Sequence, residues 1–341
     1  MKVLIVGSNS IHVSSFVKSL SKKETDLHLL TEDKCSFPEI RTEKMVDFRK
    51  LNPFSIFKNY LILKKHIAYL KPDVIHIHQL NRLAYFVSRV ASKLKLPIVS
   101  TAWGSDVLLI PYKNVFFKFL TIKTLQRSNF VTADASVMIE SMNKLESSNS
   151  KFILLQYGID MVEEKEKLDI IYSNRLHKPL YRIDQIILYF SQFNDKHSDW
   201  KLVIAGSGEQ TEFLKQMVED NHLENKVEFV GWLNSNENKE WYSKSKMFIS
   251  IPESDGTSVS VLEAMSAGCI PILSDLPVSH EWIQDSYNGV IEKEGSNPLE
   301  EALLLDYSRV NLNNKELVFQ KASRTNSIEK FFQLYQQLIL K

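Results

Sequence analysis

The sequence has few cysteines, no long apolar run and no segment built like a secretory signal. Its two cysteines, Cys35 and Cys269, offer no disulfide framework, which small secreted proteins commonly rely on. No apolar run approaches the ~20 residues that a membrane-spanning helix requires. The apolar start, residues 1–7, is too short for a signal peptide and predicts a β-strand. These absences argue against a disulfide-rich secreted protein and a membrane-spanning one, and they favour a cytoplasmic location.

The chain also lacks a strong net charge, which is +1, but its two halves differ. Over residues 1–160, 23 Lys and Arg stand against 13 Asp and Glu, whereas the remainder holds 19 basic and 28 acidic residues. A basic half suggests an anionic partner, such as lipid headgroups or a pyrophosphate-linked acceptor. The alternative is a solvated surface whose charge has no function.

Short apolar segments alternate with helical ones along the first half of the chain. Such strands are typical of a parallel sheet that helices cover on both faces. We expect strands at residues 2–6, 27–30, 73–78, 97–101, 129–132 and 152–155, and helices near 11–21, 54–70, 81–94, 114–127 and 134–146. A break at Tyr157-Gly158, followed by the charged run 163–167, predicts an interdomain linker.

The second half repeats this scheme. Its expected strands lie near residues 169–172, 201–205, 226–229, 246–251, 270–273 and 289–291, and its helices near 183–195, 209–221, 236–243, 258–267 and 297–306. We therefore predict an α/β protein of two doubly wound Rossmann-like domains, residues 1–160 and 161–313, that face each other across a cleft. A final helix, about 314–341, is expected to pack back toward the first domain.

Residues 253–271 say most about function. A short apolar strand precedes Asp255, and a helix that contains Glu263 follows it. The beginning of a helix after such a loop favours a bound phosphate, because free backbone N–H groups and the helix macrodipole face it. The N–H groups concerned are those of Thr257, Ser258 and Val259. Since carboxylates accept hydrogen bonds from sugar hydroxyls, the combination predicts a nucleotide-sugar site.

Several short motifs follow one another in an order known from one enzyme family. Asp255 and Glu263, with Gly256 between them, resemble the E-x7-E signature of retaining glycosyltransferases of family 4, which have the GT-B fold. Further matching segments are residues 7–10, 73–78, 103–106, 157–160, 175, 205–208 and 230–232. Each motif alone is weak, whereas their order over nearly the whole chain is specific for the family. The resemblance does not identify the sugar.

This resemblance implies donor-binding roles in the second half. Glu263 would accept hydrogen bonds from ribose hydroxyls, and Asp255, which replaces the family's glutamate, would accept them from the transferred sugar. The alternatives are a helix-capping box of Ser260 with Glu263 and a turn-forming Asp-Gly pair. Gly206 and Gly208 would lie near the base and ribose, or would only form a tight turn at a strand end.

Arg175 is the expected cation at the donor diphosphate. A guanidinium grips phosphate with two hydrogen bonds and keeps its charge. The family usually has a lysine a few residues later, where this chain has Tyr181. Arg182 or Lys178 would then supply the missing charge, or Tyr181 would donate a neutral hydrogen bond. Solvated surface charge is the alternative for these positions.

By the same resemblance, the first half contacts the sugar and the acceptor. Gly7 and Ser8 would approach the donor diphosphate or the acceptor, and His12 and His78 would contact the acceptor. A capping or surface role is the alternative for His12. His76 shares a strand face with His78, but no Cys or Glu partner has ligand-like spacing, so we predict no metal site.

The segment 103–106 departs from the family, which often has histidine where this chain has Trp103. An indole stacks on a sugar face but shuttles no proton, so no general base is assigned there. Core packing at the domain interface is the alternative for Trp103. Asp106 is a candidate for sugar or acceptor contact, and we group it with Asp255 and Arg175 as a catalytic candidate.

Two stretches of the basic half, residues 53–65 and 115–127, mix aromatic residues with cations. Helices of this kind lie in the headgroup region of membranes, which predicts an anionic membrane surface as a partner and a peripheral position on its inner face. The more ordinary alternative is that their apolar residues face the core of the domain.

The predicted reaction is retaining transfer of a hexosyl or N-acetylhexosaminyl group from a nucleoside diphosphate sugar, UDP- or GDP-linked, to a hydroxyl of a glycan or lipid-linked acceptor. Bacterial-type surface polysaccharide or glycoconjugate assembly is the expected setting. The nucleotide-sugar is a co-substrate, and we expect no cofactor and no nucleic-acid partner. A non-catalytic nucleotide-sugar-binding protein of the same fold is the alternative. A dehydrogenase is disfavoured because residues 7–10 lack Gly-x-Gly-x-x-Gly.

Overall fold

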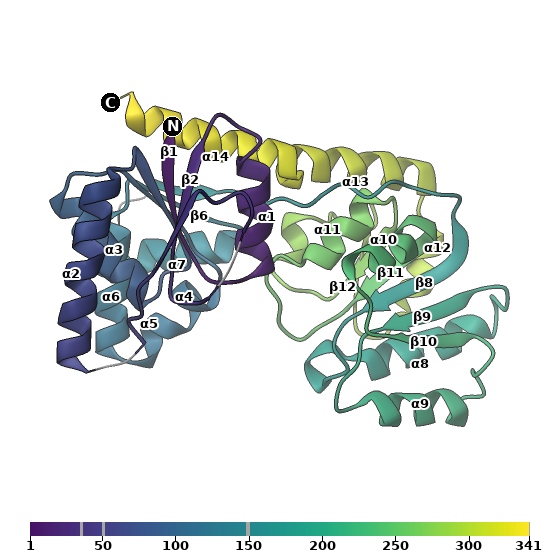
Figure 1. Cartoon of the computed structure of the whole chain (residues 1–341). Coiled ribbons are helices and arrows are strands. Elements are labelled where there is room, and N and C mark those ends of the chain that lie inside the picture. Colours follow the sequence, from purple (N-terminus) through teal and green to yellow (C-terminus); the bar gives the residue numbers. More distant parts are fainter. Residues whose placement is uncertain (35–36, 50–51, 148–150, 341) are drawn as a thin grey trace. The chain divides into compact units, whose positions relative to one another are not determined.

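The computed structural model describes residues 1–34, 37–49, 52–147 and 151–340 (Figure 1). The chain forms two compact units: unit 1 consists of residues 1–158 and 324–341, and unit 2 of residues 159–323. The chain enters unit 2 after Gly158, close to the expected boundary at 160, and leaves it after Ser323 rather than at 313. Cys35 lies outside the described residues.

Unit 1 contains a seven-stranded sheet with the order β3-β2-β1-β4-β5-β6-β7, in which all neighbours are parallel. The strands are β1 (Lys2–Val6), β2 (Asp26–Thr31), β3 (Thr42–Met45), β4 (Val74–His78), β5 (Ile98–Thr101), β6 (Phe130–Ala133) and β7 (Phe152–Leu154). The order reverses between β1 and β4, as in doubly wound sheets. Our prediction missed β3 because this edge strand has an exposed, mostly polar sequence.

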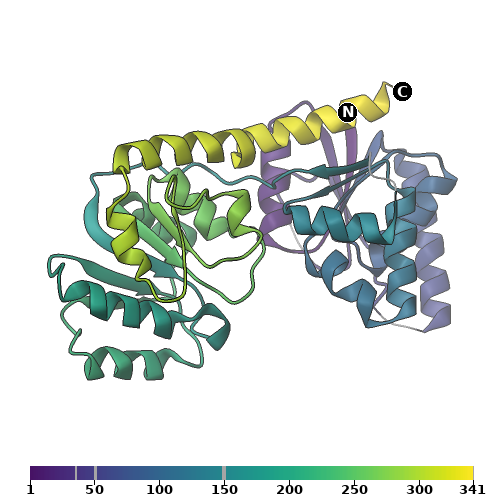
Figure 2. The ribbon, with the colours of Figure 1, turned by 180° about the vertical axis from the view of Figure 1, so that it is seen from behind.

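Helices cover both faces of this sheet (Figures 1 and 2). One face packs against α1 (Ile11–Leu20) and α14 (Arg324–Ile339), and the other against α2 (Pro53–Leu70) and α3 (Arg82–Lys93). The remaining helices are α4 (Ser105–Leu108), α5 (Ile110–Lys113), α6 (Val115–Arg127) and α7 (Ser136–Leu145). α2 begins at Pro53 because the Asn52 side chain accepts hydrogen bonds from the N–H groups of Phe54 and Ser55.

Unit 2 contains a six-stranded parallel sheet with the order β10-β9-β8-β11-β12-β13. Its strands are β8 (Leu168–Asn174), β9 (Lys201–Ala205), β10 (Val227–Gly231), β11 (Ser245–Ser250), β12 (Ile270–Leu273) and β13 (Val290–Ile291). The order reverses between β8 and β11. Apart from exposed or partly exposed ends, β8 and β11 are buried, which explains their continuous apolar sequences.

The helices of unit 2 also form two layers. Side chains of α8 (Ile183–Asn194), α9 (Thr211–Asp220) and α12 (Pro298–Leu303) enter one core, and those of α10 (Ser235–Lys244), α11 (Val259–Ser266) and α13 (Tyr307–Ala322) enter the other. Short 3-10 turns are η2 (Pro179–Tyr181) and η3 (Ser279–Glu281). The single helix expected over 314–341 is wrong, because the extended residue Ser323 pairs with Ile159 and separates α13 from α14.

Candidate functional site

Each sheet reverses its strand order at one position, and α/β proteins bind ligands at this switch point, outside the carboxyl ends of the strands. In unit 2 the switch point lies between β8 and β11. Arg175 directly follows β8, and Asp255 lies in the loop that joins β11 to α11. The fold therefore places these two predicted residues at one ligand-binding edge.

Three neighbours hold the Arg175 guanidinium. Its Nη1 donates a hydrogen bond to Ser258 Oγ at 2.9 Å, and its Nη2 forms an ion pair with the Asp255 carboxylate. Its Cζ lies 4.8 Å from the centre of the Tyr181 ring, which is a cation–π contact. Only 12% of the Arg175 side chain and 27% of the Asp255 side chain are exposed. The cation is thus held in one orientation beside the Asp255 loop.

The two residues considered as substitutes for the family's lysine lie in different surroundings. Tyr181 presents its ring to Arg175, so it orients the existing cation. Arg182 makes two hydrogen bonds to Glu292, at 2.7 and 3.0 Å, and Tyr189 donates to the same carboxylate at 2.8 Å. Arg182 and Glu292 line a polar pocket of unit 2 that shares Ser274 with the pocket beside Asp255. The charge of Arg182 is therefore already balanced by a carboxylate, whereas Lys178 is exposed.

Gly206 and Gly208 bring the loop after β9 against the backbone that carries Arg175. Gly206 has φ +110°, and a Cβ there would lie 2.3 Å from the Arg175 carbonyl oxygen. A Cβ on Gly208 would lie 2.4 Å from the carbonyl oxygen of His177. Only glycine fits at these positions, because any side chain would push away the backbone at Arg175 and His177. The turn interpretation is thus supported, and contact with the base and ribose stays a prediction.

The loop that carries Asp255 leads directly into the amino-terminal end of α11. Ser258 is the N-cap residue, yet its side chain makes no capping hydrogen bond and its Oγ instead accepts from Arg175. The first N–H groups of a helix have no partner within the helix, and the macrodipole adds positive potential. The capping box proposed for Ser260 and Glu263 is wrong, because the helix begins at Val259 and Ser260 already lies inside it.

Glu263 is half-buried on α11, close to two buried tyrosines. Burial raises the pKa values of Tyr172 and Tyr242, and the negative charge of Glu263 raises both further. Gly256 and Thr257 precede Glu263 by seven and six residues in the sequence. A half-buried carboxylate can accept hydrogen bonds from hydroxyl groups. The contact of Glu263 with ribose stays a prediction.

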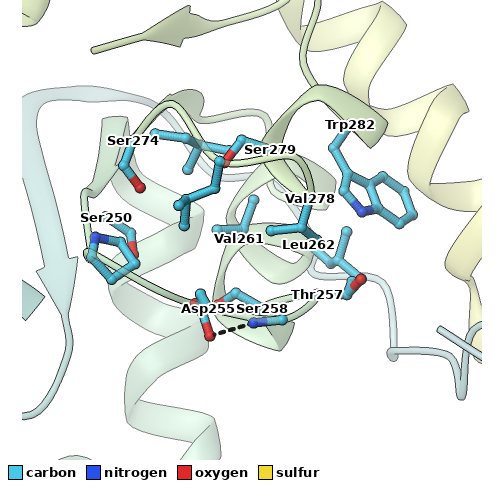
Figure 3. A pocket seen from close by; sticks show the side chains of 14 residues that line it. Ser250, Asp255, Thr257, Ser258, Val261, Leu262, Ser274, Val278, Ser279 and Trp282 are labelled. Atoms are coloured by element: carbon cyan, nitrogen blue, oxygen red, sulfur yellow. Dashed lines mark hydrogen bonds between the residues drawn. The ribbon is translucent and has the colours of Figure 1, made fainter. Parts of the chain in front are cut away.

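A pocket lies between α11 and the segments that follow β11 and β12 (Figure 3). Asp255, Gly256, Thr257 and Ser258 line its edge, and the Asp255 carboxylate accepts a hydrogen bond from the Gly256 N–H at 2.9 Å. Our sequence reasoning missed three buried residues of the lining. Ser250 Oγ, Ser274 Oγ and Trp282 Nε1 have no hydrogen-bond partner within the described part of the chain. Only the strand-end positions of the two serines offered a signal.

The switch point of unit 1 lies between β1 and β4 and brings together Gly7 and His78. A Cβ on Gly7 would lie 2.9 Å from a methyl carbon of Val13 and 3.5 Å from Cβ of His78, so the absence of a side chain lets α1 approach the sheet. Ser8 is half-buried beside it. The side chain of Ser10 caps α1 by accepting from the Val13 N–H at 3.3 Å.

Tyr157 joins the predicted acceptor residues into one cluster, although our sequence analysis placed it in a linker and in a family motif without giving it a role. Its hydroxyl contacts His78 Nδ1 and accepts a hydrogen bond from Trp103 Nε1 at 3.2 Å. The exposed ring of His12 lies 5.6 Å from the Trp103 ring and 6.0 Å from that of Tyr157. Burial lowers the pKa of His78 to about 3, so this imidazole is neutral at physiological pH.

Asp106 has a structural role in unit 1. Its side chain is buried, and its two carboxylate oxygens accept from the N–H groups of Leu80 at 2.8 Å and Trp103 at 2.9 Å. Burial raises the pKa of Asp106, and these hydrogen bonds oppose the rise. The contacts fix the segments that carry His78 and Trp103. They give no support to the catalytic role we assigned to Asp106, because the carboxylate is withdrawn from solvent.

The described residues contain neither a candidate metal centre nor a candidate membrane span. No group of three or more His, Cys, Asp or Glu side chains there is arranged to hold a metal ion. His76, which adjoins His78, uses both ring nitrogens in hydrogen bonds to Tyr335 and Thr101. No helix in the same ranges combines the length and the apolar character needed to cross a bilayer.

Two family models match the chain. The model for glycosyl transferases group 1 matches residues 159–308, and the model for glycosyl transferase 4-like proteins matches residues 2–135. The two matches thus fall on the two units. The chain belongs to the family 4 type of glycosyltransferases with the GT-B fold.

Individual relatives are distant. The O-antigen chain mannosyltransferase RfbU of Salmonella typhimurium is 27% identical over 173 residues, which are 50% of this chain and 48% of the relative. The N-acetyl-alpha-D-glucosaminyl L-malate synthase of Bacillus anthracis is 21% identical over 77% of this chain and 74% of its own length. The structure of HepE from Anabaena in complex with UDP is 11% identical, covers 99% of this chain and 100% of that one, and superimposes with a TM-score of 0.80.

Proposed function

We propose that this glycosyltransferase moves a hexosyl or N-acetylhexosaminyl group from a nucleoside diphosphate sugar to a hydroxyl group with retention of the anomeric configuration. The Arg175 guanidinium, oriented by Ser258 and Tyr181 beside the start of α11, carries the proposal. Negative charge develops on the departing diphosphate in the transition state, and positive groups fixed there lower the barrier. That HepE was crystallised with UDP supports a nucleoside diphosphate as the leaving group.

In this proposal the donor lies along the edge formed by β8, β11 and α11. Arg175 and the N–H groups of residues 257–259 contact the diphosphate, and Glu263 accepts from the ribose hydroxyls. Asp255 leaves the guanidinium when the diphosphate arrives and accepts from a hydroxyl of the transferred sugar. The exchange is favourable because a diphosphate brings more negative charge to Arg175 than one carboxylate does.

Three predicted residues of unit 1 are unsuited to the general-base role that inversion of the anomeric centre requires. His78 is buried with a pKa of about 3, Asp106 has both oxygens engaged, and Trp103 accepts no proton. We propose that the bond from the sugar C1 to the phosphate oxygen breaks while a bond to the acceptor oxygen forms on the same face. The acceptor's proton passes to the departing phosphate oxygen.

The acceptor we propose is a glycan or a lipid-linked saccharide of bacterial-type surface polysaccharide or glycoconjugate assembly. The likeness to an O-antigen chain mannosyltransferase supports this setting. The excess of basic residues over 1–160 suits a pyrophosphate-linked acceptor or an anionic membrane surface. We accordingly propose a cytoplasmic enzyme that contacts the inner face of the membrane, with a UDP- or GDP-linked donor.

A panel of UDP-, GDP-, ADP- and CMP-sugars tests the proposal. One diphosphate sugar should raise the melting temperature and be hydrolysed slowly or transferred, whereas CMP-sugars, which carry a single phosphate, should do neither. Arg175→Ala and Glu263→Ala should abolish the shift. Arg309→Ala is the matched control, because Arg309 also stacks on a tyrosine of unit 2, at 5.1 Å from the Tyr287 ring.

The outcomes separate the alternatives. Unchanged shifts in both site variants would remove the assigned roles of Arg175 and Glu263. Binding of a nucleotide-sugar without hydrolysis or transfer to any acceptor would favour a non-catalytic binding protein. The configuration of the product, followed by proton NMR of the anomeric centre, tests retention separately.

A further inference from the structure

The helices of unit 1 expose large apolar side chains that its core does not use. On α2, Phe54 and Phe57 are 77% and 62% exposed. Around the start of α6, Tyr112, Val115 and Phe116 are 55%, 84% and 56% exposed. Single exposed apolar residues are ordinary, whereas these are gathered on successive turns. The alternative in which the apolar residues of both stretches face the core is wrong for Phe54, Phe57, Val115 and Phe116.

The exposed face of α2 carries both apolar and basic side chains. Phe54, Phe57 and Leu61 succeed one another at spacings of three and four residues, so they share one face of the helix. Exposed lysines accompany them on this face at Lys58, Lys64 and Lys65. The opposite face packs into the core through Leu63 and Ile67. α2 thus buries one apolar face in the core and exposes a second apolar strip to solvent.

A chain of aromatic contacts places α2 and α6 on either side of α3. Ring centres are 6.3 Å apart between Tyr60 of α2 and Phe86 of α3, and 6.1 Å apart between Tyr85 of α3 and Phe119 of α6. Tyr85 and Phe86 are themselves 5.3 Å apart. Figures 1 and 2 show the three helices in one layer of unit 1. The exposed apolar residues of α2 and α6 therefore belong to one side of the unit.

The stretch of unit 1 that contains these helices has few acidic residues. Residues 48–133 contain 14 Lys and Arg but only two acidic residues, Asp73 and Asp106. Asp106 is buried, and Asp73 immediately precedes β4, at the opposite end of that strand from His78. Exposed lysines also accompany the apolar residues of α5 and α6, at Lys113 and Lys118. Within residues 48–133, apolar and cationic side chains thus occur together with few acidic ones.

We propose that this surface, defined by Phe54, Phe57, Leu61, Tyr112, Val115 and Phe116 with their neighbouring lysines, docks on an anionic lipid bilayer. The aromatic and aliphatic side chains would enter the headgroup region, and the lysines would contact acidic headgroups. The inference deepens the proposed function, on which it rests for the membrane-linked acceptor. It adds the helices that make the contact and the sign of the lipid charge.

Charge decides between a bilayer and a second copy of the chain. A two-fold symmetric dimer would bring this patch against itself, and lysines would then oppose lysines with few acids to compensate them. An anionic bilayer neutralises the same lysines and also accepts the apolar side chains. The bilayer is therefore the occupant that satisfies both features of the surface.

Sedimentation with vesicles tests the proposal. The full-length protein should bind vesicles of phosphatidylcholine and phosphatidylglycerol at 7:3, bind pure phosphatidylcholine at least tenfold more weakly, and lose affinity at high salt. The double variant Phe57→Ser/Phe116→Ser should reduce the partition coefficient at least tenfold. Lys58→Gln/Lys64→Gln should reduce it by about fivefold per lysine. The matched control is Leu304→Ser/Leu312→Ser, which removes two apolar residues of unit 2 that are 86% and 71% exposed.

The readouts keep this proposal separate from the proposed function. Melting temperature and nucleotide binding, measured without vesicles, should be unchanged in the unit 1 variants, because their side chains are exposed. Vesicle binding that is absent in the wild type, or equal in the control and the Phe variants, would overturn the docking surface while leaving donor binding intact. A dimer that the Phe variants convert to a monomer would assign the surface to a second copy instead.

Discussion

The ion pair between Arg175 and Asp255 leads to an unusual expectation for Asp255→Asn. In the absence of donor, the carboxylate occupies the guanidinium that we assign to the diphosphate. An amide at this position holds Arg175 less strongly and does not repel phosphate. The variant should therefore bind free UDP or GDP more tightly than the wild type, although it transfers sugar more slowly.

The size of the two effects follows from the geometry. A charge-assisted hydrogen bond contributes about 1.5–3 kcal/mol. Because 27% of the Asp255 side chain is exposed, we discount this to ~1 kcal/mol for solvent screening, which corresponds to about fivefold tighter nucleotide binding. Turnover loses a charged acceptor for a sugar hydroxyl, and a loss of up to ~3 kcal/mol corresponds to about 100-fold.

Isothermal titration calorimetry with the free nucleotide measures the change in binding, and a steady-state transfer assay measures the change in turnover. Asp169→Asn is the matched control, because Asp169 pairs with Lys246 at the amino-terminal end of β8, whereas Arg175 follows its carboxyl end. The control should change neither quantity. Weaker nucleotide binding in Asp255→Asn would refute the competition between carboxylate and diphosphate, and unchanged turnover would refute the contact with the sugar.

Three further expectations concern stability. Gly206→Ala should lower the free energy of unfolding by about 1–3 kcal/mol, because its Cβ would collide with the Arg175 carbonyl, whereas Gly256→Ala, with no atom within 4 Å, should not; equal melting temperatures would count against this packing. Asp106→Asn should destabilise by about 1–3 kcal/mol because an amide nitrogen cannot accept a backbone hydrogen bond; a stable but inactive variant would instead restore its catalytic role. The folded-state pKa of His78, about 3, lies below its ordinary value of 6.5, so the stability contributed by the neutral form is fully present above pH 6.5 and is lost as the pH falls toward 3. Unfolding by urea should show a decline of about 1.4 kcal/mol per pH unit from this residue, and His78→Gln should make the decline shallower; an identical slope in the variant would contradict the assignment.

The local pattern of apolar residues predicted most of the fold, because buried parallel strands are short and mostly apolar. It failed where tertiary contacts decide the structure. The edge strand β3 has a polar sequence and exists because it pairs with β2. Ser323 carries no helix-breaking signal, yet its pairing with Ile159 divides the last helical stretch between the two units.

The candidate site was likewise predictable only in part from the sequence. The spacing of Asp255 and Glu263 and the position of Arg175 after a strand could be recognised from motifs along the chain. The pairing of Arg175 with Asp255 could not, because the two residues are 80 positions apart. The role of Tyr157 was missed for the same reason, since its contacts with His78 and Trp103 arise only when the sheet has formed.

The most direct test of the central claim is a crystal structure of the protein soaked with UDP. We expect the diphosphate against the Arg175 guanidinium and the N–H groups at the start of α11, with Glu263 on the ribose and the Asp255 carboxylate turned away from Arg175. A diphosphate bound elsewhere, with the Arg175–Asp255 pair intact, would contradict the account.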